Sequence, residues 1–114
     1  MKIKRFDIWT ADLNPQIGTE PGKVRPVLII QTDLLNAVYP STIVCPLTTN
    51  VIKESEILRV HIRKGIAGVS KPSDIMIDQI RAIDNNRLIN KIGELPNDIS
   101  KTVLENLKIV LDID

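Results

Sequence analysis

The feature that most constrains this chain is a loop rich in proline and glycine that leads directly into an apolar, β-branched run. Residues 21–30 read Pro-Gly-Lys-Val-Arg-Pro-Val-Leu-Ile-Ile. A short apolar run bounded by turn residues predicts a buried strand. Arg25 stands where this strand begins, and an unpaired guanidinium is costly to bury. Two alternatives stay open: a structural ion pair, which this segment alone favours, or an anion pocket, since guanidinium grips phosphate bidentately.

The remaining elements predict a mainly β protein with one C-terminal helix. Further strands, separated by turn signals, are expected at residues 6–11, 41–47, 57–62, 74–83 and 88–95. The strand at 41–47 should end or lie at an edge at Pro46, which has no N–H for a ladder. A single helical turn is expected at 32–36. Asn97 should cap a terminal helix whose apolar residues recur at helical spacing. We expect one domain, residues 1–114, with a largely antiparallel sheet that closes into a small barrel.

Composition narrows the class of protein. The chain has 114 residues, 43% of them hydrophobic and 25% charged, which fits one globular domain. A single cysteine, Cys45, excludes an internal disulfide and is expected to be a small core residue. The first residues lead into a strand, and no apolar run reaches transmembrane length. These features predict a cytoplasmic protein with no membrane segment.

Several kinds of chemistry are disfavoured. One histidine and one cysteine cannot build a zinc site, so neither a metal nor another cofactor is expected. His61 is predicted to be a strand residue that faces solvent or a carboxylate. No nucleophile elbow and no glycine-rich nucleotide loop are present. With only three aromatic residues, recognition of nucleic acid by base stacking is also disfavoured.

Charge is unevenly distributed along the chain. Residues 1–93 carry thirteen Lys and Arg against nine Asp and Glu, whereas residues 94–114 carry two against five. A body at +4 with a tail at −3 suits a polyanion on one surface, although ordinary solvated charge gives the same count. Polar residues also gather in two regions: Thr19 and Glu20 lie in the loop of residues 14–23 with Arg25 at its exit, and Thr48 and Thr49 follow the strand at 41–47. An arginine and a threonine hydroxyl that converge would bind one phosphate, while each taken singly is more often structural.

The order and spacing of several segments resemble the MazF/PemK family of toxin endoribonucleases from type II toxin–antitoxin pairs. The matching segments are residues 7–9, 12–15, 18–20, 22–28, 43–48, 78–84 and the terminal amphipathic helix. Phe6 departs from the glycine usual in the family. Residues 49–73, in the region that helps relatives choose the cleaved sequence, match weakly.

The resemblance implies an SH3-like or CcdB-like barrel, a homodimer, and metal-independent cleavage of single-stranded RNA, including mRNA. Attack by the 2′-hydroxyl would leave a 2′,3′-cyclic phosphate and a 5′-hydroxyl, and the resulting block of translation and growth would be neutralised by the acidic C-terminal segment of a cognate antitoxin. The family's catalytic arginine and threonine fall on Arg25 and Thr48. The other residues expected to contact RNA are Thr19, Glu20, Lys23, Thr49 and Gln79.

Two questions stay open at this stage. The family arginine is described as both acid and base, but arginine stays protonated, so Glu20 or solvent is an alternative base. A CcdB-like gyrase poison and a catalytically silent antitoxin-binding domain also remain as alternatives. The presence of Arg25 and Thr48 argues against the gyrase poison.

Overall fold

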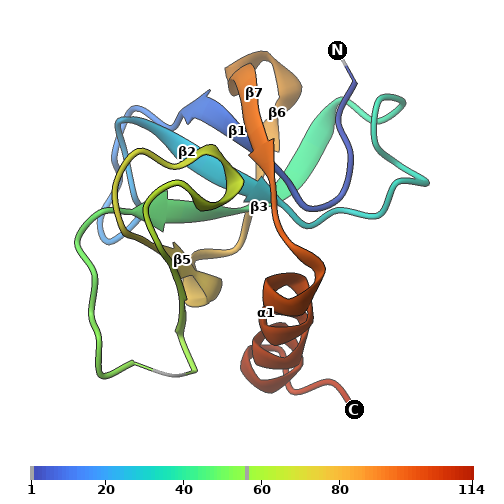
Figure 1. Cartoon of the computed structure of the whole chain (residues 1–114). Helices are drawn as coiled ribbons and strands as arrows, with labels where there is room; N and C mark the ends of the chain where they lie inside the picture. Colours follow the sequence, from blue (N-terminus) through green and yellow to red (C-terminus); the bar gives the residue numbers. More distant parts are fainter. Residues whose placement is uncertain (1, 56) are drawn as a thin grey trace.

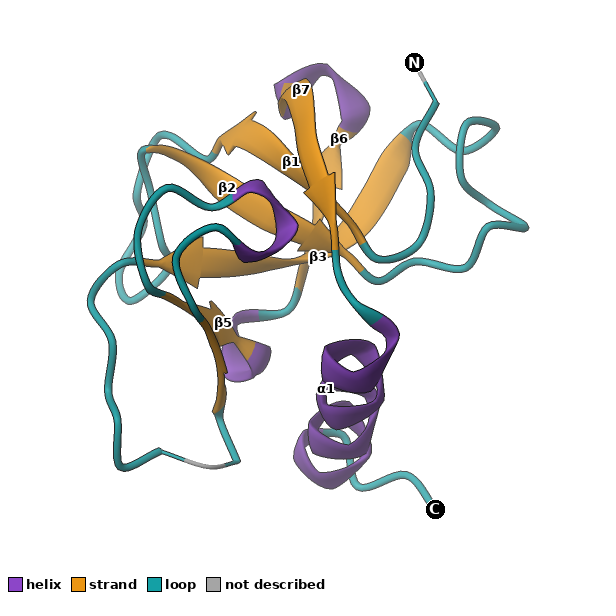
Figure 2. Cartoon of the chain, viewed as in Figure 1, coloured by secondary structure: helices purple, strands orange, loops and turns teal. Residues whose placement is uncertain are grey.

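The computed structural model describes residues 2–55 and 57–114 and shows a strongly curled β sheet with one terminal helix (Figures 1 and 2). The strands are β1 Asp7–Asp12, β2 Val24–Ile29, β3 Ser41–Thr48, β4 Arg59–Ile62, β5 Ser73–Met76, β6 Arg81–Asp84 and β7 Leu88–Glu94. They run in the order β4-β5-β3-β2-β1-β7, with β6 also paired to β3, and every pair is antiparallel. The helix α1 spans Asn97–Val110. The expected class, mainly antiparallel β with one C-terminal helix, is confirmed.

The central strands are buried on both faces, which explains their nearly continuous apolar sequences. One core cluster contains Leu28 of β2 and Cys45 of β3, together with Val103 and Leu107 of α1. The other cluster, on the opposite face, contains Val27 of the same strand β2. The terminal helix therefore covers only one of the two faces, as its single apolar stripe requires.

The strand expected at 74–83 is wrong as a single element. The chain there forms β5, a short 3₁₀ turn η2 at Ile77–Gln79, and β6. Between the pairs Val44–Arg81 and Leu47–Ile75, β3 advances three residues while its partner chain advances six. The surplus residues form the turn, because Pro46 offers no N–H to the ladder at that point and Ile77 fills the core.

Contrary to the sequence prediction, Pro46 does not end β3. It lies where β3 exchanges one partner, β6, for another, β5, and β3 continues to Thr48. The expected cap is also corrected: helix α1 follows Pro96, Asn97 is its first helical residue, and no side chain caps it. The turn expected at 32–36 is present, since the N–H of Asn36 donates to the carbonyl of Thr32.

The loop between β4 and β5 is fixed to β7 by contact between backbones. A Cβ on Gly68 would lie 2.0 Å from the carbonyl oxygen of Ile92, and a Cβ on Gly93 would lie 2.2 Å from that of Ala67. Only glycine permits so close an approach at both places. This contact sets where the following residues, Ser70 and Lys71, emerge.

Within the described residues, no helix has the length and apolarity needed to cross a membrane.

Candidate functional site

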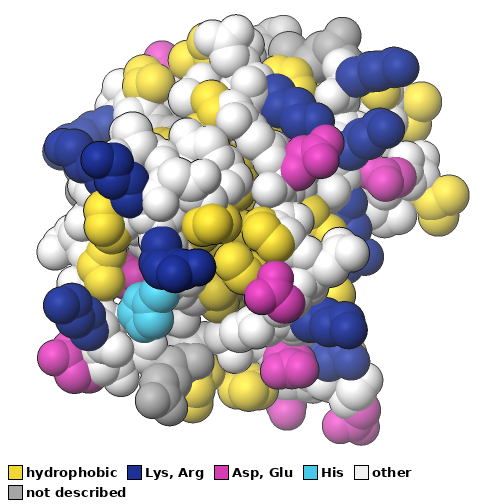
Figure 3. All heavy atoms as spheres, viewed as in Figure 1, with side chains coloured by type: hydrophobic (Ala, Val, Ile, Leu, Met, Phe, Trp, Pro, Cys, Tyr) yellow, Lys and Arg dark blue, Asp and Glu magenta, His cyan; other side chains and the backbone are white. Residues whose placement is uncertain are grey.

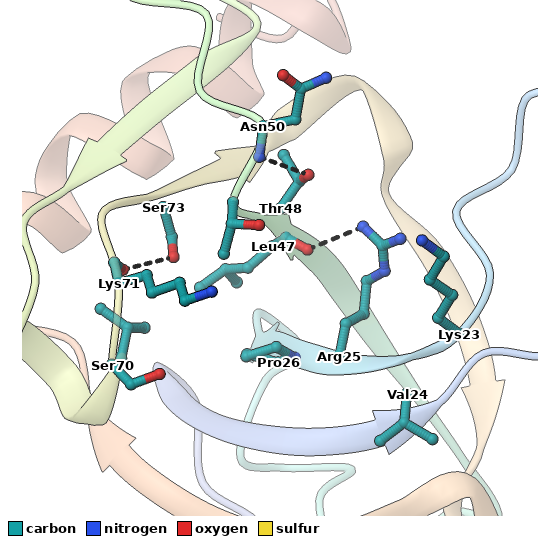
Figure 4. Close-up of a pocket in the computed structure, with 12 residues that line it drawn as sticks. Lys23, Val24, Arg25, Pro26, Leu47, Thr48, Asn50, Ser70, Lys71 and Ser73 are labelled. Atoms are coloured by element: carbon teal, nitrogen blue, oxygen red, sulfur yellow. Dashed lines mark hydrogen bonds between the residues drawn. The ribbon is translucent and has the colours of Figure 1, made fainter.

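A pocket of about 370 Å³ opens where β2, the end of β3 and the β4–β5 loop meet. On the face of the molecule shown in Figure 3, basic side chains are spread over several places instead of forming one continuous patch. The pocket, in contrast, is lined by three cations, Lys23, Arg25 and Lys71, and by no carboxylate of the residues that the structure describes. Its other lining residues are Val24, Pro26, Leu47, Thr48, Thr49, Asn50, Val69, Ser70 and Ser73 (Figure 4).

Arg25 reaches across from β2 to the end of β3. Its Nε donates to the carbonyl of Gly22 at 2.8 Å, and its Nη1 donates to the carbonyl of Leu47 at 3.1 Å. No described carboxylate pairs with it, so the structural ion pair that its sequence segment favoured is not observed. Partial burial lowers the pKa of Arg25 below its ordinary value, because desolvation penalises the charged form. The Nη2 group makes no hydrogen bond to a described residue, so its donors are available to an anion.

Gly22 is needed where the loop turns into β2. A Cβ there would lie 2.6 Å from the Cβ of Gln16, closer than real side chains approach. The same glycine offers the carbonyl that binds the Nε of Arg25. The loop therefore folds tightly upon itself, and this closure orients the arginine.

Thr48, the last residue of β3, has a hydroxyl with one acceptor role already in use. Its Oγ1 accepts a hydrogen bond from the N–H of Asn50 at 3.1 Å. The hydroxyl proton remains available as a donor, because a threonine oxygen both accepts and donates. Thr48 follows Leu47, whose carbonyl binds Arg25, so the arginine and the threonine converge on one pocket, which the sequence alone had left open.

Four of the predicted site residues line this pocket: Lys23, Arg25, Thr48 and Thr49. Lys23 takes a left-handed backbone conformation, with φ at 69°, and its N–H donates to the Oδ1 of Asn14.

The other three, Thr19, Glu20 and Gln79, do not line the pocket. Glu20 instead lies 3.8 Å from Arg81. That contact brings the loop before β2 next to the segment that follows Gln79.

The pocket residues that the sequence analysis did not predict include three polar ones near the end of the β4–β5 loop: Ser70, Lys71 and Ser73. They lie at the end of a loop with glycine and proline, within residues 49–73, the stretch that resembles the family only weakly. A lysine in such a loop was the one available signal. The position of Lys71, however, depends on the close approach of Gly68 to β7, and no local sequence pattern reveals this approach.

Two other sequence predictions are confirmed. Cys45 is fully buried in the core, and burial raises the pKa of its thiol to about 12. His61 lies in β4 and contacts the carboxylate of Asp74. Among the described residues, no three side chains of His, Cys, Asp or Glu are grouped so that they could hold a metal ion.

Comparison with known proteins agrees with this geometry. Residues 4–111 match the family of PemK-like, MazF-like toxins of type II toxin–antitoxin systems. The chain is 40% identical over 111 residues to the endoribonuclease EndoA of Bacillus subtilis (strain 168), covering 97% of this chain and 96% of that protein.

Solved structures show the same fold. MazF from Deinococcus radiodurans superposes with a TM-score of 0.85 at 24% identity, covering 99% of both chains. A MazE–MazF structure from the same organism superposes at 0.79, also at 24% identity, covering 100% of this chain and 99% of that one. The family match spans nearly the whole chain, and this protein therefore belongs to the PemK-like, MazF-like toxin family of type II toxin–antitoxin systems.

Proposed function

We propose that this protein is a metal-independent endoribonuclease that cleaves single-stranded RNA at short sequences. The observation that carries the proposal is the convergence of Arg25 and Thr48 on one pocket that is lined by three cations and, within the described part of the chain, by no carboxylate. Such a pocket suits a phosphodiester, whose charge grows on the non-bridging oxygens during cleavage. The 40% sequence identity to an endoribonuclease, over 97% of this chain, supports the same activity.

The reaction needs only groups that RNA, the pocket and water supply. The 2′-oxygen attacks the adjacent phosphorus and forms a new O–P bond, while the bond from phosphorus to the 5′-oxygen breaks. The products are a 2′,3′-cyclic phosphate and a 5′-hydroxyl. The free Nη2 donors of Arg25 and the hydroxyl of Thr48 stabilise the developing charge, and the pocket aligns the attacking and leaving oxygens.

Two protons must also move. Glu20 lies outside the pocket and is directed to Arg81, so water takes the proton of the 2′-hydroxyl in our proposal. Arg25 gives a proton to the leaving 5′-oxygen. A lower pKa makes the guanidinium a stronger acid, which favours this transfer, and water afterwards returns a proton to the neutral arginine.

Beyond the pocket, we assign RNA contacts to Thr19, Glu20 and Gln79. The contact of Glu20 with Arg81 joins the loop before β2 to the segment after Gln79 and so supplies a second polar surface. Lys23 and Thr49 contact RNA inside the pocket itself.

The biological role we propose is inhibition of translation and growth through mRNA cleavage in the cytoplasm. A cognate antitoxin neutralises the toxin by laying an acidic C-terminal segment along the cationic pocket, where it competes with RNA. The toxin acts as a homodimer. The family's place in toxin–antitoxin systems supports the antitoxin, and the three pocket cations supply the complementary charge.

The decisive experiment uses an RNA in which one deoxynucleotide replaces the nucleotide just 5′ of the cut. Cleavage should stop, because the attacking hydroxyl is gone, and a chelator should leave cleavage of the normal RNA unchanged. Mapping the cuts across a mixed RNA pool also gives the recognised sequence. Continued cleavage of the deoxy substrate, or loss of activity in chelator, contradicts the mechanism.

The partners are tested separately. Sedimentation of the purified protein should give the mass of two chains, and a single-chain mass contradicts the homodimer. In a competition titration, antitoxin peptide and a non-cleavable RNA should each weaken the other's binding. Independent binding would show that they do not share the pocket.

A further inference from the structure

Asp74 is a buried carboxylate in β5, the strand that lies between β3 and β4. It is 0% exposed, and it stands in β5 opposite Thr48 of β3 on one side and opposite His61 of β4 on the other. A buried carboxylate is tolerated only where cations and hydrogen-bond donors compensate its charge. The segments that supply these cations and donors are therefore the parts of the chain that Asp74 holds in place.

Two of its partners tie it to the segment that follows Thr48. Asp74 Oδ2 accepts a hydrogen bond from the N–H of Ile52 at 2.9 Å and from Arg59 Nη1 at 3.2 Å. The same Nη1 donates to the carbonyl of Asn50 at 3.2 Å. The N–H of Asn50 in turn donates to the Thr48 hydroxyl. A chain of contacts thus runs from the buried carboxylate to the hydroxyl at the pocket.

His61 extends this arrangement further along the same segment. Its Nδ1 contacts the Oδ1 of Asp74, and its Nε2 lies 3.0 Å from the carbonyl of Ser55. These two contacts connect the carboxylate of Asp74 to the chain at Ser55. We call Arg59, His61 and Asp74 the anchor cluster.

The anchor cluster is not itself arranged as a ligand site. A second cavity of about 480 Å³ opens beside it, lined in part by Lys53, Arg59, His61 and Asp98. The histidine is visible at the surface beside basic side chains (cyan and dark blue in Figure 3). Both ring nitrogens of His61 and the Nη1 of Arg59 are already engaged within the protein. The cluster therefore uses its contacts to bind residues 50–55 of the chain.

We propose that the anchor cluster is a positioning device for RNA cleavage, an inference that rests on the proposed function. Asp74 holds Arg59, Arg59 holds the carbonyl of Asn50, and Asn50 fixes the rotamer of the Thr48 hydroxyl. Ile52, bound directly to Asp74, fixes the far end of the same segment. Small displacements of a group that acts on the transition state lower the rate strongly.

The main test is Arg59→Lys, because lysine keeps the positive charge that Asp74 needs, but its shorter side chain does not bring the ammonium to the point where Nη1 of Arg59 contacts both Asp74 and Asn50. We expect the single-turnover rate at saturating RNA to fall roughly 10- to 100-fold with little change in KM. Arg63→Lys is the matched control: this arginine just beyond β4 is exposed, its side chain makes no hydrogen bond or ion pair with a described residue, and the rate of the variant should stay unchanged.

A double-mutant comparison separates positioning from general stability. In a Thr48→Ala background, Arg59→Lys should no longer lower the rate, because the group that it positions is absent. An equal loss in both backgrounds, or a lower Tm with an unchanged rate, overturns the proposal.

A readout that needs no RNA keeps the inference separate from the proposed function. In Asp74→Asn, amide hydrogen exchange at Ile52 should accelerate relative to core amides such as that of Val103, because the charged acceptor is lost. Unchanged protection at Ile52 overturns the anchor whether or not the protein cleaves RNA. If the wild-type protein shows the anchor but cuts no RNA, the proposed function fails instead.

Discussion

Arg25 Nη1 donates to the carbonyl of Leu47 across 3.1 Å, and Leu47 is the residue that immediately precedes Thr48. A single hydrogen bond thus ties the start of β2 to the end of β3 at the mouth of the pocket. Because a carbonyl and not a carboxylate receives this bond, the positive charge of the guanidinium is not neutralised within the described residues. The charge remains available to a phosphate.

The first prediction concerns Arg25 itself. Arg25→Ala should lower the single-turnover cleavage rate by roughly 10²–10³, the usual loss for one removed oxyanion donor. The free energy of unfolding should fall by only about 1–2 kcal/mol, since the lost partners are backbone carbonyls at a half-buried site. Thermal melts beside single-turnover rates check both values.

Arg25→Lys sharpens this test. Lysine keeps the charge but loses the planar fork, so the variant should remain badly impaired in cleavage while it folds normally. A variant that melts early yet cleaves at the normal rate once folded would assign Arg25 a structural role only.

The second prediction concerns Thr48. Thr48→Ala should lower the cleavage rate, whereas Thr48→Ser should retain most of it, because serine restores both the donor and the acceptor that binds Asn50. The double variant Arg25→Ala, Thr48→Ala should lose less than the product of the two single losses if both groups hold one phosphate. Strictly multiplicative losses would indicate that they act at separate places.

Much of the architecture was predictable because the local signals agree with the global fold. Residues 27–30 are apolar on both sides of the strand, and this part of β2 is indeed buried on both faces. Arg25 and Thr48 stand at strand ends, so their convergence needed only the antiparallel pairing of β2 with β3. The family resemblance supplied the same two residues.

The rest depends on register and on contacts between distant segments. The alternation along 74–83 continues through Ile77, so the sequence does not reveal the three extra residues opposite Pro46. The anchor cluster requires Asp74 to stand between Thr48 and His61 in the sheet. A shift of the strand register by one residue would move the Asp74 side chain to the other face of the sheet.

The third prediction uses the buried thiol. Burial, with a smaller contribution from the charge of Asp78, raises the pKa of Cys45 from 9.0 to about 12. Above pH 9 the thiol ionises in the unfolded chain while the native thiol stays protonated, so the unfolded state binds fewer protons and stability falls as pH rises. Urea unfolding between pH 8 and pH 11 should show a steeper decline in the wild type than in Cys45→Ala.

Reactivity gives an independent check on the same thiol. The native protein should resist alkylation at pH 8, and the unfolded protein should react readily, because the thiolate is the reactive form. Rapid labelling of the native protein would contradict both the burial and the raised pKa.

The last prediction concerns Lys71, the pocket cation that the sequence did not single out. Lys71→Ala should weaken binding of a non-cleavable RNA about equally for all sequences, because a phosphate contact carries no base information. The slope of log K against log salt should become shallower by about 0.7, the value for one phosphate contact on a single strand. Lys64→Ala is the matched control, since Lys64 is exposed in the same loop but does not line the pocket. Equal slopes for the two variants would mean that the pocket does not hold the phosphate. A slope that changes only in Lys71→Ala places the RNA backbone between the β4–β5 loop and Arg25.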